Sequence, residues 1–512
     1  MKFLLRYLFC LLTPATLLAQ TAKANHNIDQ LSGIDSVLNS VLKDQHIAGF
    51  AVAVVKGNDV IYSKGFGYRD VANKKPVTPN TLFAIGSSSK AFTASLLGIL
   101  RKEGKLTFED KAVGLLPQLQ FYNDEMNRQI TLRDLMAHRS GLSRYDLSWF
   151  LFNTQNRDSI IARVKYMKPT AAVREKWYYN NFMYLAQGMI TERFTGKTWE
   201  QNITEKFFIP LNMTRSNTDI KTFQNDNDAA LPYTVEKDNT IKKIPYYNIN
   251  GMGPAGSINS SVTDMANWLK IWLNEGKLNG KEILPVDYIT EAVSSQMVME
   301  AALPDKHEDV FLANYGLGWM IGSYRGHYVV EHGGNINGFS ANVAFFPSDK
   351  LGIVVLTNQS VSKVPTIITN SIADKMLKLT PFDWNGEVTA KAKKATQTKK
   401  EAQKFALNTM PSHPLKDYAG SFFNPAYGTI KITFENKNLY TILGDEKIVL
   451  KHMHYDVFDP RSIDKNGKAD TEQSNLMFNF STDLEGKIQS IGIFLDGSEK
   501  PVQFDLINPV KK

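Results

Sequence analysis

The hydrophobic pattern predicts that the chain begins with one helix and a hairpin. Apolar residues recur at three- and four-residue spacing over residues 26–43, which predicts an amphipathic helix. Residues 48–55 and 60–68 form two strand-like runs separated by a turn at residues 57–59. Because the connection is so short, the two strands pair as a hairpin rather than as part of a β-α-β unit.

Helical spacing dominates the middle of the chain. A short apolar run at residues 82–85 leads through serines into an apolar helix over residues 91–100. A second helix is expected within residues 131–142, with Thr131 as its N-cap and Gly141 as its C-terminal stop.

Strands then return and close this part of the chain, followed by a last helix over residues 364–379. The expected strands cover residues 315–321, 327–331, 340–346 and 352–357. Strands at both ends with helices between them predict an α+β fold of the α/β-sandwich kind. One antiparallel sheet would be flanked by helices and would carry a helical subdomain.

The C-terminal part changes character. Residues 381–411 include a charged, Ala-rich stretch and are expected to form a helical linker. Residues 412–512 contain short alternating runs separated by Asn, Asp and Gly, which predict a small all-β, barrel-like domain. The expected strands cover residues 418–423, 429–434, 438–442, 447–451, 475–482 and 488–494.

An aromatic cluster follows the second predicted helix, at Tyr145, Trp149, Phe150 and Phe152. It could line a cleft or belong to the core, and the pattern leaves both interpretations open.

Composition narrows the possible partners. A chain of 512 residues is too long for one compact core, so two or more domains are expected. Apolar residues make up 43% and charged residues 21%, as in ordinary globular proteins. The formal charge of +8 is spread along the chain without a basic-aromatic repeat, so a nucleic-acid partner is not expected.

The first 22 residues have the pattern of a signal peptide. Lys2 and Arg6 precede an apolar run over residues 7–19, which is too short to span a bilayer. We therefore expect a secreted or periplasmic protein with no membrane span after signal removal; an uncleaved anchor is the alternative. The only cysteine, Cys10, lies within this run, so the mature chain would have no disulfide, cysteine nucleophile or thiolate metal site.

The main candidate for chemistry is the pair Ser87 and Lys90. Residues three apart share one face of a helix, so the hydroxyl and the amine would lie side by side at a helix N-terminus. A Ser-x-x-Lys pair supplies the nucleophile and base of penicillin-recognising serine enzymes. The chain contains four such pairs (Ser40/Lys43, Ser87/Lys90, Ser360/Lys363 and Ser462/Lys465), and only Ser87 stands between a strand-like run and a long apolar helix. The alternative function of this serine is an N-cap.

Two further motifs follow Ser87 in the sequence. Tyr179-Asn180-Asn181 could supply a second proton-transfer group, although Tyr178/Asn180 and Tyr246/Asn248 have the same spacing. His332-Gly333-Gly334 occurs once, on a predicted strand, where glycines would let a substrate backbone approach closely.

In their order and identity these three motifs resemble those of the class C β-lactamase and DD-peptidase-like serine hydrolases. The resemblance covers residues 27–380, and residues 412–512 resemble the small lipocalin-like β domain often appended to such hydrolases, most clearly at residues 450–458.

The resemblance implies a role for each matched residue. Ser87 would attack a carbonyl and become acylated, and Lys90 would deprotonate it. Tyr179 would pass protons to the leaving group, and Asn181 would hold the substrate amide or the lysine. The oxyanion would be bound by the backbone N–H groups of Ser87 and Asn335, beside His332 and Gly334.

One departure from the family concerns His332, where many β-lactamases carry lysine. A neutral imidazole would hold a substrate carboxylate less firmly, and we expect activity to change as His332 titrates between pH 5 and 8. His452-x-His454-x-Asp456 matches the start of a metal motif but lacks the ligands to complete it, so no metal or other cofactor is expected.

The sequence therefore predicts a secreted serine hydrolase acting on amide or ester bonds: a peptidase on D-amino-acid peptides, an esterase or a weak β-lactamase. Its substrate would be a small molecule or peptide, with peptidoglycan fragments as one candidate. The alternative is a penicillin-binding or wall-fragment-sensing protein on the same scaffold.

Overall fold

A computed structural model describes residues 30–152, 154–236, 238–300, 313–402, 409–444, 446–463, 469–470, 474, 476–495 and 500–507. The expected signal peptide at residues 1–22 lies outside this range, as do parts of the expected linker. Within the described residues, no helix is both long and apolar enough to cross a bilayer.

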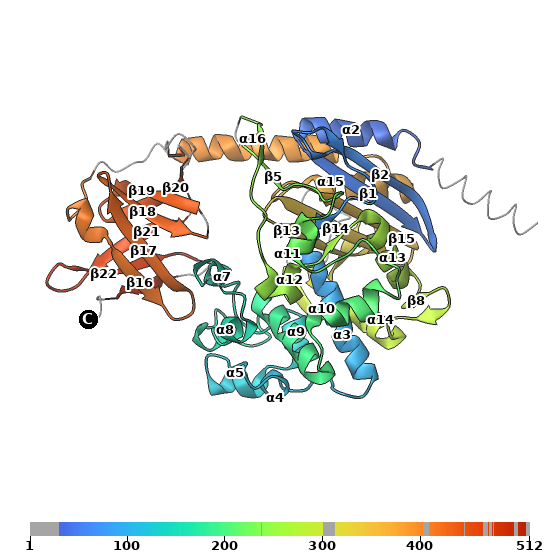
Figure 1. The fold of residues 1–512 in the computed structure, drawn as a ribbon, viewed down its shortest axis with the longest axis horizontal. Coiled ribbons are helices and arrows are strands. Elements are labelled where there is room, and N and C mark those ends of the chain that lie inside the picture. Colours follow the sequence, from blue (N-terminus) through green and yellow to red (C-terminus); the bar gives the residue numbers. More distant parts are fainter. Residues whose placement is uncertain are drawn as a thin grey trace, which may run out of the picture.

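One large antiparallel sheet organises the N-terminal part of the protein (Figure 1). In the described residues it has nine strands in the order β10-β11-β12-β13-β14-β15-β1-β2-β3, so strands from both ends of this region meet in one sheet. The strands are β1 Gly49–Lys56, β2 Asp59–Asp70, β3 Lys75–Pro76, β10 Met297–Glu300, β11 Ala313–Tyr315, β12 Met320–Tyr324, β13 His327–Ile336, β14 Phe339–Phe346 and β15 Leu351–Thr357.

The centre of this sheet is buried on both faces. On β1, Phe50, Val52 and Val54 belong to one apolar cluster, whereas Ala51 and Ala53 belong to another. The first cluster includes side chains of α2 (Ile34–Asp44) and α15 (Val364–Met376), and the second includes side chains of α3 (Ser89–Lys102) and α13 (Val262–Leu273). Side chains alternate between the faces of a strand, so helices must cover both faces to bury this continuous apolar run.

Along the chain, the helical subdomain lies between strands β1–β3 and strands β10–β15 of the sheet. Its helices and the remaining ones of this part are α4 Ala112–Leu115, α5 Asp124–Gln129, α6 Leu132–Met136, α7 Leu147–Leu151, α8 Arg157–Ile161, α9 Asn181–Thr195, α10 Trp199–Ile203, α11 Ile220–Gln224, α12 Gly253–Gly256 and α14 Val286–Ala292, with short turns η1 Gly86–Ser88, η2 Val164–Tyr166, η3 Thr204–Phe208 and η4 Asn250–Met252. Three small two-stranded ladders join β4 Phe83–Ala84 to β7 Asn259–Ser260, β5 Tyr233–Val235 to β6 Ile241–Lys243, and β8 Lys277–Leu278 to β9 Lys281–Glu282.

The C-terminal strands close into a barrel, which α16 (Trp384–Ala402) connects to the rest of the protein (Figure 1). Tyr418, Phe458 and Phe480 pack edge to face inside the apolar core of the barrel, with ring centroids 5.0 to 5.5 Å apart. The barrel contains η5 Leu415–Tyr418 and the strands β16 Gly420–Asn424, β17 Gly428–Glu435, β18 Asn438–Leu443, β19 Glu446–His454, β20 Val457–Ser462, β21 Phe478–Thr482, β22 Ile488–Ile493 and β23 Val502–Leu506.

The predicted fold class is confirmed: a mixed helical and antiparallel fold with a second, all-β domain. Three local expectations were wrong. The strand expected at residues 315–321 is divided between β11 and β12, because a turn at residues 316–319 brings the chain past α3. The helix expected to end at Gly141 ends at Met136, with Ala137 as its C-cap, because His138 adopts a positive φ of 55°. Strands β20 and β23 were not predicted.

Candidate active site

The nucleophile loop exposes only one of its three serines. Ser88 Oγ donates to the carbonyl oxygen of His332 at 2.8 Å, and Ser89 Oγ donates to that of Gly86 at 2.8 Å. Ser87 forms no side-chain cap of α3, and it is the partly exposed residue in the otherwise buried stretch 81–90. The Ser87 hydroxyl therefore takes no part in capping α3, and the N-cap alternative is wrong for this serine.

The loop conformation depends on a glycine immediately before the nucleophile. Gly86 has a φ of 52°, and a Cβ there would lie 2.8 Å from the Asn335 nitrogen. This left-handed conformation and the close strand favour glycine. Ser87 lies partly exposed within the turn η1, and α3 starts directly after it.

Lys90 is fully buried next to Ser87. Its Nζ lies 3.1 Å from Ser87 Oγ, 2.6 Å from Asn181 Oδ1 and 2.7 Å from the carbonyl oxygen of Ala255. Burial lowers the pKa of Lys90 well below its usual value, and the nearby Arg144 guanidinium adds to this effect. A neutral amine has two protons, which the two oxygens can accept. Its lone pair is then available to the Ser87 hydroxyl.

Tyr179 lies over the same amine. Lys90 Nζ is 4.8 Å from the Tyr179 ring centroid, and the ring is 8% exposed. Burial raises the pKa of Tyr179, although the hydrogen bond with Ser87 and the charge of Arg144 act in the opposite direction. The phenol is thus a proton donor at neutral pH. Of the three Tyr-x-Asn pairs, this is the one whose asparagine reaches Lys90.

Arg144 and Asp146 extend the site, and neither was predicted from the sequence. Asn181 Nδ2 donates to Asp146 Oδ1 at 3.1 Å, while Arg144 Nε donates to Asp146 Oδ2 at 2.6 Å. The Arg144 guanidinium also lies over the Tyr179 ring. Both residues follow the helix predicted within residues 131–142, but no pattern marks them, because Tyr179 and Asn181, which they contact, are 35 residues away in sequence.

Strand β13 supplies the opposite wall. A Cβ on Gly334 would lie 1.8 Å from the carbonyl oxygen of Ile85 and 3.1 Å from the Ser87 nitrogen, so only glycine allows this strand to approach the nucleophile loop. Asn335 is exposed at this point of the strand. The structure thus brings the backbone of Ser87 beside that of Gly334 and Asn335, the groups that the family resemblance implies as the oxyanion site.

His332 is buried rather than directed to solvent. Its Nδ1 donates to the carbonyl oxygen of Gly333 at 2.7 Å, and its Nε2, 3.0 Å from the Tyr315 hydroxyl, accepts from it. This tautomer is assigned from the partners, since a carbonyl can only accept. Burial lowers the pKa of His332 to about 3. The expectation that His332 titrates between pH 5 and 8 is therefore wrong, since desolvation disfavours the imidazolium.

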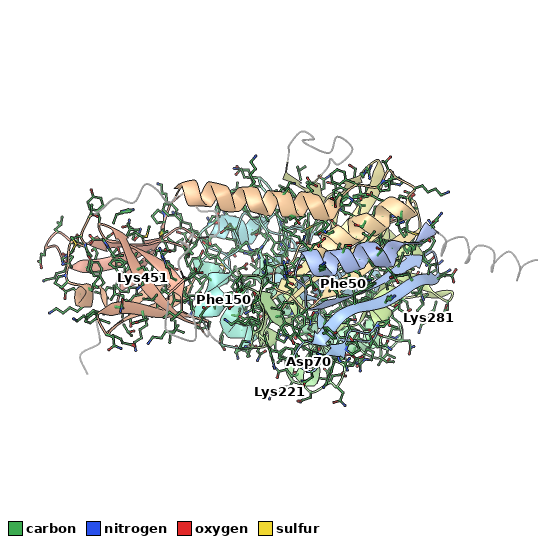
Figure 2. The ribbon with its side chains drawn as sticks, turned by 90° about the horizontal axis from the view of Figure 1, so that it is seen from above. Phe50, Asp70, Phe150, Lys221, Lys281 and Lys451 are labelled. Atoms are coloured by element: carbon green, nitrogen blue, oxygen red, sulfur yellow. The ribbon has the colours of Figure 1, made fainter. Side chains whose placement is uncertain are left out.

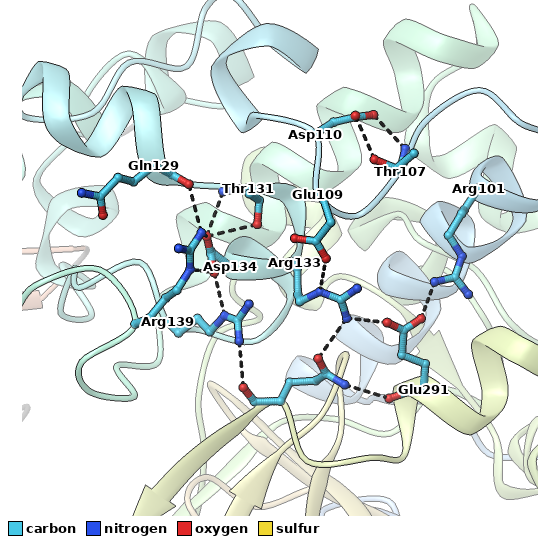
Figure 3. Close-up of polar contacts among 12 residues, drawn as sticks. Arg101, Thr107, Glu109, Asp110, Gln129, Thr131, Arg133, Asp134, Arg139 and Glu291 are labelled. Carbon is cyan, nitrogen blue, oxygen red and sulfur yellow. Dashed lines mark hydrogen bonds and ion pairs between the residues drawn. The ribbon is translucent and has the colours of Figure 1, made fainter.

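A buried ion cluster fixes the segment that carries Tyr179. Asp134 has a fully buried side chain that accepts from Arg139 Nε at 2.6 Å (Figure 3). The same carboxylate accepts from Arg174 Nη2 at 2.7 Å. It also completes a capping box with Thr131, which confirms Thr131 as the N-cap of α6. Arg174 N donates to the carbonyl oxygen of Arg139 at 2.8 Å, so the cluster ties the two chain segments together just before the Tyr179 motif.

Two residues of the His452-x-His454-x-Asp456 motif form hydrogen bonds within the barrel domain. His452 Nε2 lies 2.8 Å from the Tyr455 carbonyl oxygen, and the Asp456 carboxylate accepts from Ser412 and Tyr418. No group of three or more potential metal ligands occurs among the residues that the structure describes.

The aromatic cluster divides between the two interpretations left open by the sequence. Tyr145 is buried and stacks on Tyr427 of the barrel with ring centroids 4.9 Å apart. Trp149 and Phe150 line a cavity. Phe152 lies against Arg163, whose guanidinium carbon is 3.6 Å from the ring centroid.

Comparison with known proteins agrees with this fold. The profile of the Beta-lactamase family matches residues 27–375, and that of a domain of unknown function, DUF3471, matches residues 406–507. The chain belongs to the Beta-lactamase family, whose members are typically serine hydrolases.

Three similar proteins illustrate the relationship. The unguisins hydrolase ungD' of Aspergillus campestris is 26% identical over 456 residues, which cover 83% of this chain and 81% of that protein. An octameric penicillin-binding protein homologue from Pyrococcus abyssi superposes with a TM-score of 0.61 at 21% identity, covering 93% of this chain and 99% of the other. A D-stereospecific amidohydrolase from Streptomyces superposes with a TM-score of 0.54 at 19% identity, covering 67% and 99%. At such identities, the two solved structures support the fold alone.

Proposed function

We propose that this protein is a secreted or periplasmic serine hydrolase that cleaves amide or ester bonds of D-amino-acid peptides or related small substrates through a Ser87 acyl-enzyme. The observation that carries the proposal is the buried Lys90 amine 3.1 Å from Ser87 Oγ, with two oxygen acceptors for its protons. A neutral amine in this position is a general base.

Acylation follows from this arrangement. Lys90 Nζ takes the proton of Ser87 Oγ as the oxygen forms a bond with the substrate carbonyl carbon. The carbonyl oxygen becomes an oxyanion, which the N–H groups of Ser87 and Asn335 would bind. When the oxyanion collapses, the bond from carbon to the leaving nitrogen or oxygen breaks and the acyl-enzyme remains.

Tyr179 gives a route for the proton to the leaving group. Its neutral phenol donates a proton to the departing amine or alkoxide, and Lys90 returns the proton taken from Ser87 to the phenolate oxygen. In deacylation, a water replaces the leaving group and the transfers run in reverse, which restores Ser87. The raised pKa of Tyr179 favours this relay over a standing phenolate.

A chromogenic ester tests the proposal. An initial burst of product followed by steady turnover, both lost in Ser87→Ala, is the expected result. Labelling of Ser87 without turnover would favour the sensing protein instead, and turnover retained in Ser87→Ala would reject the mechanism. A panel of D-Ala-D-Ala peptides, D-aminoacyl amides, short esters and a cephalosporin then identifies the substrate class.

A further inference from the structure

A cavity of about 280 Å³ lies where the helical subdomain meets the barrel. Its walls include the rings of Trp149 and Phe150, at the end of α7, and of Tyr247, while Gly444 of the barrel closes one side. Phe150 lies between the barrel and the rest of the protein (Figure 2). The volume is close to the lower end, about 300 Å³, of cavities that bind small ligands.

Two chain segments link the walls of this cavity to residues that contact the Ser87 loop and Lys90. Ile249 lines both this cavity and a second one that includes Gly256 and Ile336, the residue after Asn335. A Cβ on Gly256 would lie 3.6 Å from Ile249 Cδ1 and 3.5 Å from the Gly86 carbonyl carbon. Ile249 is therefore close to the nucleophile loop. Helix α7 supplies another wall of the cavity, with Trp149 and Phe150. Asp146, directly before this helix, binds Asn181, the hydrogen-bond partner of Lys90.

The barrel is held firmly enough to form part of this wall. Ser148 Oγ, on α7, donates to the carbonyl oxygen of Ala426 at 2.7 Å, and Arg163 Nη1 donates to that of Pro425 at 2.7 Å. With the stacked Tyr145 and Tyr427 rings, these bonds fix the loop between β16 and β17 against the helical subdomain.

The lining indicates what the cavity would accept. It contains no charged side chain. Its polar acceptors are engaged locally, since Gln155 Oε1 accepts from Gly251 N, Thr154 Oγ1 from Asn156 N and Asn248 Oδ1 from Asn250 N. The lining therefore combines the three rings with uncharged amide and hydroxyl groups. Phe150 and Tyr247 are 5.5 Å apart and tilted, a geometry in which aromatic groups pack favourably.

We infer that this cavity is a subsite, completed by the C-terminal barrel, for an uncharged aromatic side chain on the residue whose carbonyl Ser87 attacks. The inference rests on the proposed function and names its preferred substrates, namely aromatic D-aminoacyl amides and esters. It also gives the barrel a function in substrate selection.

Matched p-nitroanilides of D-Phe and D-Ala test the inference in the full-length protein. Wild type should prefer D-Phe in kcat/KM by about tenfold or more, as expected for burial of a ring. Phe150→Ala, which removes one wall, should abolish most of this preference, mainly by lowering kcat/KM for D-Phe. Gly444→Asn should do the same by filling the cavity, because asparagine tolerates the φ of 63° and a Cβ there would lie 3.4 Å from Phe150 Cδ1.

The control is Phe152→Ala, a variant in the same segment whose ring packs on Arg163 outside the cavity. It should retain the preference for D-Phe. Equal kcat/KM values for the two wild-type substrates, or equal losses in Phe150→Ala and Phe152→Ala, would overturn the inference. A preference seen only with an aromatic leaving group would overturn the assignment to the acyl side.

A binding measurement separates failure of the subsite from failure of the proposed function. If no substrate shows Ser87-dependent turnover, the proposed function fails. N-acetyl-D-phenylalanine amide can still be titrated calorimetrically into Ser87→Ala, with and without Phe150→Ala. Binding weakened about tenfold by Phe150→Ala supports the subsite, and binding that is absent or unchanged rejects it.

Discussion

The guanidinium carbon of Arg144 lies 4.7 Å from the ring centroid of Tyr179. The same guanidinium pairs with Asp146, whose other oxygen accepts from Asn181, the partner of Lys90. One half-exposed cation thus contacts the proposed proton donor directly and is linked to the proposed base through a chain of three hydrogen bonds. A positive charge here favours both a neutral amine at Lys90 and transient negative charge on Tyr179.

Replacing Arg144 should therefore shift the pH dependence of the reaction. Activity rises with pH as Lys90 loses its proton. Because the Arg144 charge helps to lower the pKa of Lys90, Arg144→Gln should raise that pKa and move the acidic limb of the kcat/KM profile to higher pH. Arg144→Lys keeps the charge and should restore most of the wild-type profile. A limb that does not move in Arg144→Gln would contradict this coupling.

Lys90→Met should remove the base while preserving an unbranched buried side chain. Loss of general-base catalysis should lower kcat by about 10²- to 10⁴-fold. Stopped-flow measurement of the ester burst checks the acylation step specifically, and circular dichroism verifies that the variant is folded. A burst of wild-type rate in Lys90→Met would assign the base to another group.

His332 should remain neutral from pH 8 to pH 5. With a pKa of about 3, its ring nitrogens should keep the shifts of the Nδ1–H tautomer over this range in nitrogen-detected NMR of histidine-labelled protein. A midpoint near 6 would show that the ring is reached by solvent.

The same buried imidazole should make the fold acid-sensitive. The unfolded chain binds a proton at His332 below about pH 6.5, but the folded chain does so only near pH 3. Stability is therefore lost as pH falls between these values, at about 1.4 kcal/mol per pH unit for this group. Urea unfolding of His332→Gln between pH 6 and 4 should show a slope shallower by that amount, and an unchanged slope would contradict it.

Asp134→Ala should destabilise the protein strongly. It leaves Arg139 and Arg174 without their buried partner and removes the capping box of α6, a loss of about 3 kcal/mol. The matched control is Glu109→Ala on the neighbouring Arg133, whose exposed carboxylate should contribute less than about 1 kcal/mol (Figure 3). Urea denaturation measures both, and comparable losses would show that burial does not set the difference.

The pH dependence of the Asp134 contribution follows from its pKa. Burial raises that pKa, but the bonds from Arg174 and Thr131 outweigh burial and leave it below the usual value. The contribution should therefore be present at neutral pH and be lost progressively as the pH falls from about 4, where the unfolded chain's carboxylate takes up a proton, through the lower pKa of the folded carboxylate. The stability difference between wild type and Asp134→Ala should narrow over that range.

Local sequence spacing was sufficient to predict many of the helices and strands and part of the active site. Ser87 and Lys90 are one helical turn apart, so their contact follows from helix geometry. Alternating or continuous apolar runs predicted β1, β2, β14 and β15, because side-chain burial repeats along a strand. β20 was missed because Pro460 and the charged residues around it interrupt that pattern.

Only the folded chain brings Arg144 to Tyr179, Tyr315 to His332 and Gly444 to Phe150. These contacts join segments far apart in sequence, where no local period reports proximity. The sequence also could not predict the pKa shifts of Lys90 and His332. A lysine and a histidine have their ordinary pKa values until packing excludes water from them, so the lowered pKa of the amine beside Ser87 is a product of tertiary burial rather than of residue identity.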